Sequence, residues 1–160
     1  MRFTTFYGRT MTRQREVLSK IKAALKETDY STRDFFEVDN EDEFIYVCTK
    51  DGLIGIDCCH YEFVFHPDDM SHLSLEVHFW ETKDNYYFEE IKDLLPPLLE
   101  FASWYDDEGL RRIRYTAKNA YLSIDDKDIV KKALNLLRNL DNYIGEPLKK
   151  VVLKHPELRD

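Results

Sequence analysis

The chain has 160 residues, of which 43% are hydrophobic and 14% aromatic, so we expect one domain over residues 1–160 with a substantial core. Its formal net charge of −8 argues against nucleic acid as a partner, because binding phosphates requires a basic surface. No apolar run approaches the ~18 residues of a membrane span, and no signal-peptide core is evident at the N-terminus. Three cysteines make no disulfide framework, so we predict a cytoplasmic protein with reduced thiols and no membrane partner.

The first predicted helix runs from Thr12, which suits the N-cap position, to about Glu27. Residues 1–9 fit either a short strand or an arm, and the polar stretch 30–42 predicts a linker with a short extended piece at 35–38. The apolar side chains of the helix recur at helical spacing on one face: Val17, Leu18, Ile21, Ala24 and Leu25.

Residues 43–81 predict a three-stranded antiparallel meander, because runs rich in β-branched and aromatic residues are separated by two turn signals. Asp51-Gly52 is a strong hairpin signal, since glycine accepts the positive φ of a primed turn. A β-bulge near Cys58-Cys59 would bring the apolar residues of the second strand onto one face. The expected strands cover about 44–49, 53–66 and 73–80, with the second turn at 67–71.

The register of the second hairpin follows from the alternation of its side chains. With His66 opposite His72, one face pairs apolar residues only: Phe65 with Leu73, Phe63 with Leu75, and Tyr61 with Val77. The other face pairs Val64 with Ser74, Glu62 with Glu76, and His60 with His78. A one-residue slip would exchange the faces, so we expect the apolar face beneath helices and the imidazoles and carboxylates on the outer face.

The stretch after the meander predicts a helix and then a second hairpin. Asp84 or Asn85 can cap the helix, and Pro96-Pro97 ends or kinks it because proline removes a hydrogen-bond donor. Strands at 100–105 and 110–117 are preferred over a continued helix.

The last helix is predicted to begin at Asp125 or Asp126 and to end at Gly145, before Pro147 opens a short final helix. Its apolar residues form a wide stripe at helical spacing. The expected fold class is therefore α+β, with an antiparallel sheet built from the three-stranded meander plus a hairpin. Helices pack on one face of this sheet, in the order αβββαββα.

The polar face of the meander has two interpretations. Directly opposed positions lie ~5 Å apart, so one metal ion could reach two imidazoles and a carboxylate among His60, Glu62, Glu76 and His78. The alternative, which we favour, is that the histidines neutralise the glutamates diagonally, and we expect no metal and no cofactor. The mid-strand cysteines are expected to be small buried hydrophobes.

Exposed aromatic residues are common hot spots in protein interfaces, and several rings of this chain lie outside the predicted core. Together with the polar face they give our predicted partner-binding residues. These are Trp80, His60, Glu62, Glu76, His78, Trp104 and Tyr105.

The order of elements resembles the type III secretion chaperone-like fold, including bacterial YbjN-type domains. The resemblance is carried by the meander at 43–81, the helix after it, the segment FASWYDDEGLRRIRY at 101–115 and the closing helix at 129–152. It implies a non-enzymatic, chaperone-like or regulatory protein of the bacterial cytoplasm that binds another polypeptide, often as a homodimer. The family has no catalytic residues to transfer.

Two alternatives remain open. An acidic surface would also suit an immunity or inhibitor protein that occludes a basic toxin. Pro67-Asp68 with Glu81-Thr82-Lys83 matches the PD-(D/E)XK nuclease signature, and the register makes Asp57, Glu81 and Lys83 the better metal-dependent constellation. Because acid-x-lysine recurs by chance in so charged a chain, for instance at Glu90-Ile91-Lys92, we predict no catalytic residues and no enzyme.

Overall fold

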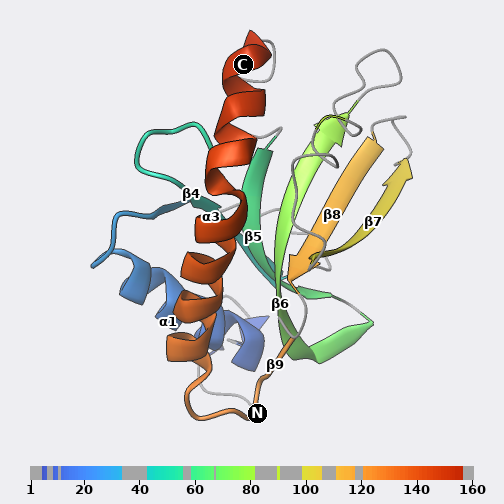
Figure 1. Cartoon of the computed structure of the whole chain (residues 1–160). Coiled ribbons are helices and arrows are strands. Elements are labelled where there is room, and N and C mark those ends of the chain that lie inside the picture. The colour runs from blue at the N-terminus through green and yellow to red at the C-terminus, as the bar shows by residue number, and fades with distance from the viewer. Residues whose placement is uncertain are drawn as a thin grey trace.

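The computed structural model describes residues 5–6, 9–10, 12–33, 43–55, 59–66, 68–81, 90, 99–105, 111–117 and 121–156. The fold is α+β, as the sequence predicted: helices α1 (Arg13–Leu25) and α3 (Ile129–Lys154) accompany an antiparallel sheet. In the view of Figure 1, α3 runs along the sheet in front of β5 (Cys59–His66), with which it shares the hydrogen bond from Tyr61 to Asp141, and α1 lies beside the N-terminal half of α3. Among the described helices, none is long and apolar enough to cross a membrane.

The described strands form one large sheet and one small one. The strands of the large sheet are β3 (Ser31–Arg33), β4 (Glu43–Cys48), β5 (Cys59–His66), β6 (Asp69–Glu81), β7 (Leu99–Tyr105), β8 (Arg111–Ala117) and β9 (Leu122–Ser123). Their order is β3-β4-β5-β6-β8-β7, with β9 pairing β6, and the neighbouring strands run antiparallel. The meander and the hairpin are therefore confirmed, and they join because β8 pairs with β6. The two-stranded sheet pairs β1 (Thr5–Phe6) with β2 (Arg9–Thr10).

The register between β5 and β6 is the one that the sequence predicted, except near the turn. The confirmed pairs are His60 with His78, Tyr61 with Val77, Glu62 with Glu76, Phe63 with Leu75, and Val64 with Ser74. The register then shifts between Val64 and His66, so His66 pairs with Asp69 and the expected pairing with His72 is wrong. The cause is a shorter turn, because β6 already begins at Asp69. The bulge expected near Cys58 falls on residues outside the described ranges.

The apolar face of β5 and β6 lies in the core with the two helices. Thr12 caps α1 as predicted, since its Oγ1 accepts a hydrogen bond from the Arg15 backbone N–H at 3.2 Å. The apolar stripe of α1 is buried in the same cluster as the inward residues of the strands. This core includes Val17, Leu18, Ile21, Leu25, Tyr61, Phe63, Leu75, Val77, Leu137, Ile144 and Leu148.

The last helix is longer than expected, because α3 continues through Gly145 and Pro147. The apolar period does not end at Gly145, and burial of Leu148, Val151 and Val152 offsets the helix-breaking tendency of proline. The start of the helix also differs from expectation. Its N-cap is Asp128, and the Asp126 carboxylate instead accepts a hydrogen bond from the Asp128 backbone N–H at 2.9 Å.

A further correction concerns the first hairpin. Gly52 has the positive φ of 72° that the turn signal predicted, but the second strand begins at Cys59 rather than near residue 53. Gly55 has a φ of 131°, and a Cβ there would lie 2.4 Å from the Cβ of Cys48, so this bend requires glycine.

The predicted linker contains β3, which pairs with β4. Of the helix expected after residue 84, only Glu90 lies within the described residues.

Candidate functional site: a buried network of histidines and glutamates

The polar face of β5 and β6 is inside the molecule. The relative exposure is 0% for His60, 5% for Glu62, 0% for Glu76 and 9% for His78. The sequence correctly grouped these side chains on one face, because side chains alternate along a strand. The expectation that this face is the outer one is wrong. A partner resting on the outside of this fold would not reach these four side chains.

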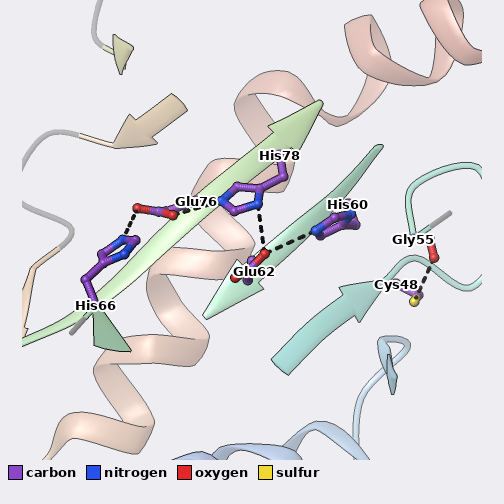
Figure 2. A network of polar contacts seen from close by, with 7 residues as sticks. All are labelled: Cys48, Gly55, His60, Glu62, His66, Glu76 and His78. Carbon is purple, nitrogen blue, oxygen red and sulfur yellow. Dashed lines mark hydrogen bonds and ion pairs between the residues drawn. The ribbon is translucent and has the colours of Figure 1, made fainter. Parts of the chain in front are cut away.

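One half of the network is centred on Glu62 of β5. Its Oε2 lies 3.2 Å from His60 Nε2 on the same strand and 2.9 Å from His78 Nδ1 on β6 (Figure 2). Tyr46 of β4 stacks on the His60 ring, with ring centroids 3.6 Å apart and planes inclined by 22°. The carboxylate therefore joins two imidazoles, and the tyrosine ring supports one of them.

The other half is centred on Glu76 of β6. Its Oε1 lies 2.9 Å from His78 Nε2, and its Oε2 lies 2.9 Å from His66 Nε2. The Ser74 hydroxyl also donates to Oε2, at 2.8 Å. The side chain of His66 is 20% exposed, so the contacts form a continuous path from buried His60 to the rim of the sheet, as Figure 2 shows.

The contacts of His78 fix its charge. Both of its ring nitrogens face carboxylate oxygens, so both must donate and the ring is an imidazolium. Burial alone would lower the pKa of His78, but the charges of Glu62 and Glu76 and their hydrogen bonds outweigh it and raise the pKa to about 9. Burial would likewise raise the pKa of Glu62, but the charge of His78 and hydrogen bonds from His60 and His78 lower it to about 2.

The contacts of the network agree only in part with the prediction that each histidine pairs diagonally with a glutamate of the neighbouring strand. The diagonal contact between His78 and Glu62 was predicted, whereas His60 contacts Glu62 of its own strand rather than Glu76 across the sheet. His66 was missed because it was expected opposite His72 at the end of the strand, away from Glu76. The signal was present, since even-numbered positions of β5 share one face and His66 has the same parity as His60.

Three residues of the network offer a binding site for a cation. One atom each of His60, Glu62 and His78 lies within 4.8 Å of the other two. Imidazole nitrogens with a carboxylate oxygen are a ligand set that divalent transition metals accept.

The cysteines behave as small buried residues, as predicted. Cys48 and Cys59 are free and buried, and Cys48 Sγ lies 3.4 Å from the Gly55 carbonyl oxygen, to which it donates. Cys58 lies outside the described residues.

The remaining predicted site residues are placed only by the backbone register. Trp80 in β6 and Trp104 in β7 both align with Arg112 of β8, and Tyr105 aligns with Arg111. Their role in partner binding stays a prediction. Of the nuclease constellation, Glu81 lies at the end of β6, whereas Asp57 and Lys83 lie outside the described residues.

A second site, which sequence reasoning missed, is an open cleft of about 850 Å³. It lies where the end of α1, the turn after β4 and the middle of α3 meet, so no local motif could reveal it. Its lining residues are Lys26, Glu27, Thr28, Asp29, Tyr30, Thr49, Lys50, Asp51, Arg138, Asp141 and Lys149.

Hydrogen bonds hold the walls of this cleft in place. The Asp141 carboxylate accepts from the Tyr30 hydroxyl at 2.6 Å and from the buried Tyr61 hydroxyl at 2.7 Å, and burial together with this carboxylate raises the pKa of both phenols. Lys149 Nζ lies 2.8 Å from Asp51 Oδ2. Burial would raise the pKa of Asp51, but hydrogen bonds from Lys149 and Thr49 outweigh it and lower the pKa to about 2.

Comparisons of the chain with models of known protein families, with curated proteins and with solved structures returned no match.

Proposed function

We propose that this protein binds another polypeptide without catalysing a reaction, and that the cleft beside α3 holds that partner. The observation that carries the proposal is the mixed charge of the lining. Four side chains are basic and four are acidic. The basic ones are Lys26, Lys50, Arg138 and Lys149, and the acidic ones are Glu27, Asp29, Asp51 and Asp141.

The lining favours an extended polar segment of a polypeptide over other ligands. Such a segment presents backbone donors and acceptors together with charges of both signs, which pair with a wall of both signs. A nucleic acid would bring its phosphates against four carboxylates. An apolar small molecule would need a mostly hydrophobic lining. Lys26 and Arg138 are exposed at the cleft, where they can meet carboxylates of the partner.

The finer role that we propose is that of a chaperone-like or regulatory protein of the cytoplasm, acting alone or as a homodimer. The alternative, an inhibitor of a basic toxin, is favoured by the net charge of −8. The balanced charge of the cleft supports the first role more, because a strongly basic partner would meet four cations there.

The test compares two charge reversals on α3. The partner is captured from the native host with wild-type protein and identified, and its binding segment is synthesised as a labelled peptide. Arg138→Glu reverses a charge in the cleft, and we expect at least a tenfold loss of peptide affinity in fluorescence anisotropy. Lys131→Glu makes the same charge change at an exposed position of α3 outside the cleft lining, so it should keep wild-type affinity.

Two outcomes would overturn the proposal. One is the capture of no polypeptide at near-stoichiometric amount. The other is an equal affinity of wild type, Arg138→Glu and Lys131→Glu for the identified peptide. Both variants change exposed side chains, so their melting temperatures should match wild type within a few degrees.

A further inference from the structure

We infer that His60, Glu62 and His78 form a binding site for one divalent transition-metal ion, with Zn²⁺ as the expected ion. The inference is independent of the cleft and of the polypeptide that we propose for it. It starts from the positions of the three donor atoms and from the groups around them. The metal ion is an addition to the hydrogen bonds and ion pairs described above, which are complete without it.

The donor atoms already have nearly the separation that zinc needs. Glu62 Oε2 lies 3.2 Å from His60 Nε2 and 2.9 Å from His78 Nδ1, and donor atoms of all three residues lie within 4.8 Å of one another. Zinc bonds to nitrogen and oxygen are ~2.0–2.2 Å long, so ligand atoms of a tetrahedral site stand about 3.3 Å apart. A small outward movement of Glu62 would therefore open space for an ion among the three.

The surroundings of the donors are those of a metal site. A histidine that binds a metal through one nitrogen usually donates its other N–H to a carboxylate, which fixes the ring and strengthens the ligand. His78 Nε2 has this partner in Glu76 Oε1, at 2.9 Å. Glu76 is fixed in turn by the Ser74 hydroxyl and by His66.

The charge of the network is compatible with a bound cation. Glu62 and Glu76 occupy directly opposed positions on neighbouring strands and are 5% and 0% exposed. Two carboxylates at such positions repel each other unless positive charge lies between them, and without an ion the His78 imidazolium supplies that charge. A divalent ion bound to two neutral imidazoles would balance both carboxylates. On binding, His78 Nδ1 would release its proton, and neutral His60 would carry its proton on Nδ1 instead of Nε2.

Burial indicates what the ion would do. None of the three ligands is more than 9% exposed, so a substrate has no approach to the ion and catalysis is not its role. The ligands come from β5 and β6, so the ion would cross-link the two central strands of the sheet. We therefore assign it a structural role.

The test uses the full chain without a histidine tag. Chelator-treated protein is incubated with excess ZnCl₂, passed through gel filtration and analysed for bound metal. We expect about one Zn²⁺ per chain and a higher melting temperature with zinc. We also expect Co²⁺, used as a probe in place of zinc, to give the visible absorption of a tetrahedral site with nitrogen and oxygen ligands.

Variants locate the site. His60→Gln and His78→Gln should each lose at least tenfold in zinc affinity, and Glu76→Gln should lose about 10–100-fold because it supports a ligand. His72→Gln and His155→Gln are the matched controls, since these histidines contact Asp69 and Glu90 outside the network. Both controls should keep one zinc ion per chain.

The inference is overturned if wild-type protein retains no zinc at micromolar concentration, or if Co²⁺ gives only an octahedral spectrum. It is also overturned if His72→Gln or His155→Gln loses the ion, because the metal would then lie at the surface. Should the variants of the network fail to fold, the stoichiometry and the Co²⁺ spectrum of wild type still decide the question.

Discussion

The two faces of the strands β5 and β6 are buried to nearly the same degree but are built from opposite kinds of side chain. On the core face, Tyr61, Phe63, Leu75 and Val77 are at most 1% exposed. On the other face, the four innermost residues of the polar network are at most 9% exposed, namely His60, Glu62, Glu76 and His78. Burial therefore does not distinguish the faces of this hairpin. What distinguishes them is how each side chain contributes to the free energy of folding.

Apolar burial is non-directional and roughly proportional to area, so neighbouring side chains can compensate for small changes of shape. A buried carboxylate or imidazolium has no such tolerance, because it is stable only while a partner of opposite charge is present. The core face should thus respond to lost volume, and the polar face to lost charge.

The largest effect is expected on the core face. Phe63 is fully buried in the central cluster, and Phe63→Ala removes most of its side chain and leaves a cavity. We expect a loss of about 4 kcal/mol in the free energy of unfolding, measured with urea. Tyr143→Ala removes a ring of similar size from a position 57% exposed and should change this free energy by less than about 0.5 kcal/mol. A loss of less than 1 kcal/mol in the free energy of unfolding of Phe63→Ala would contradict the placement of Phe63 in the core.

A pair of shape-conserving substitutions sharpens the contrast. Glu62→Gln keeps the shape of the side chain but removes one of the two charges that face His78, so we expect a loss of about 3 kcal/mol in the presence of chelator. Leu75→Met conserves volume on the opposite face of the sheet and should cost less than about 1.5 kcal/mol. Equal losses in the two variants would show that charge pairing is not what stabilises the polar face.

Much of this hairpin could be predicted from the sequence because alternation at a period of two residues determines both faces at once. Five cross-strand pairs, from His60 with His78 to Val64 with Ser74, were assigned correctly. The burial of the polar face could not be predicted in the same way. Alternation says which residues share a face, but it says nothing about which distant segments cover that face.

The errors elsewhere have local causes. Gly145 and Pro147 resemble a helix stop and a helix start, yet the apolar residues beyond them hold α3 together in the tertiary structure. The strand β6 begins at Asp69 rather than near residue 73, so His66 aligns with Asp69 instead of His72, and its side chain contacts Glu76. The cleft brings together three segments that are far apart in the sequence, so its site could only be seen in the fold.

The smallest effect is a dependence on pH that only the polar face should show. The folded-state pKa of His78 is about 9, against 6.5 for an ordinary histidine, so its contribution is complete below pH 6.5 and is lost as the pH rises toward 9. The folded-state pKa of Glu62 is about 2, against 4.5, so its contribution is present above pH 4.5 and is lost as the pH falls toward 2. Chelator-treated protein should therefore be most stable between about pH 4.5 and 6.5.

The decrease in the free energy of unfolding above pH 6.5 is the more informative part of this pH dependence. Between pH 6.5 and 8 the loss should reach about 2 kcal/mol in urea unfolding, because the unfolded chain releases the proton that the folded chain keeps on His78. Cys48 and Cys59 also ionise in the unfolded chain near the upper end of this range, but they do so equally in His78→Gln. Subtracting the variant's profile from that of wild type isolates the histidine. Phe63→Ala should lower the free energy of unfolding at every pH without changing its slope against pH. If this free energy depends on pH in the same way in wild type and His78→Gln, the two carboxylates do not hold the proton on the His78 ring.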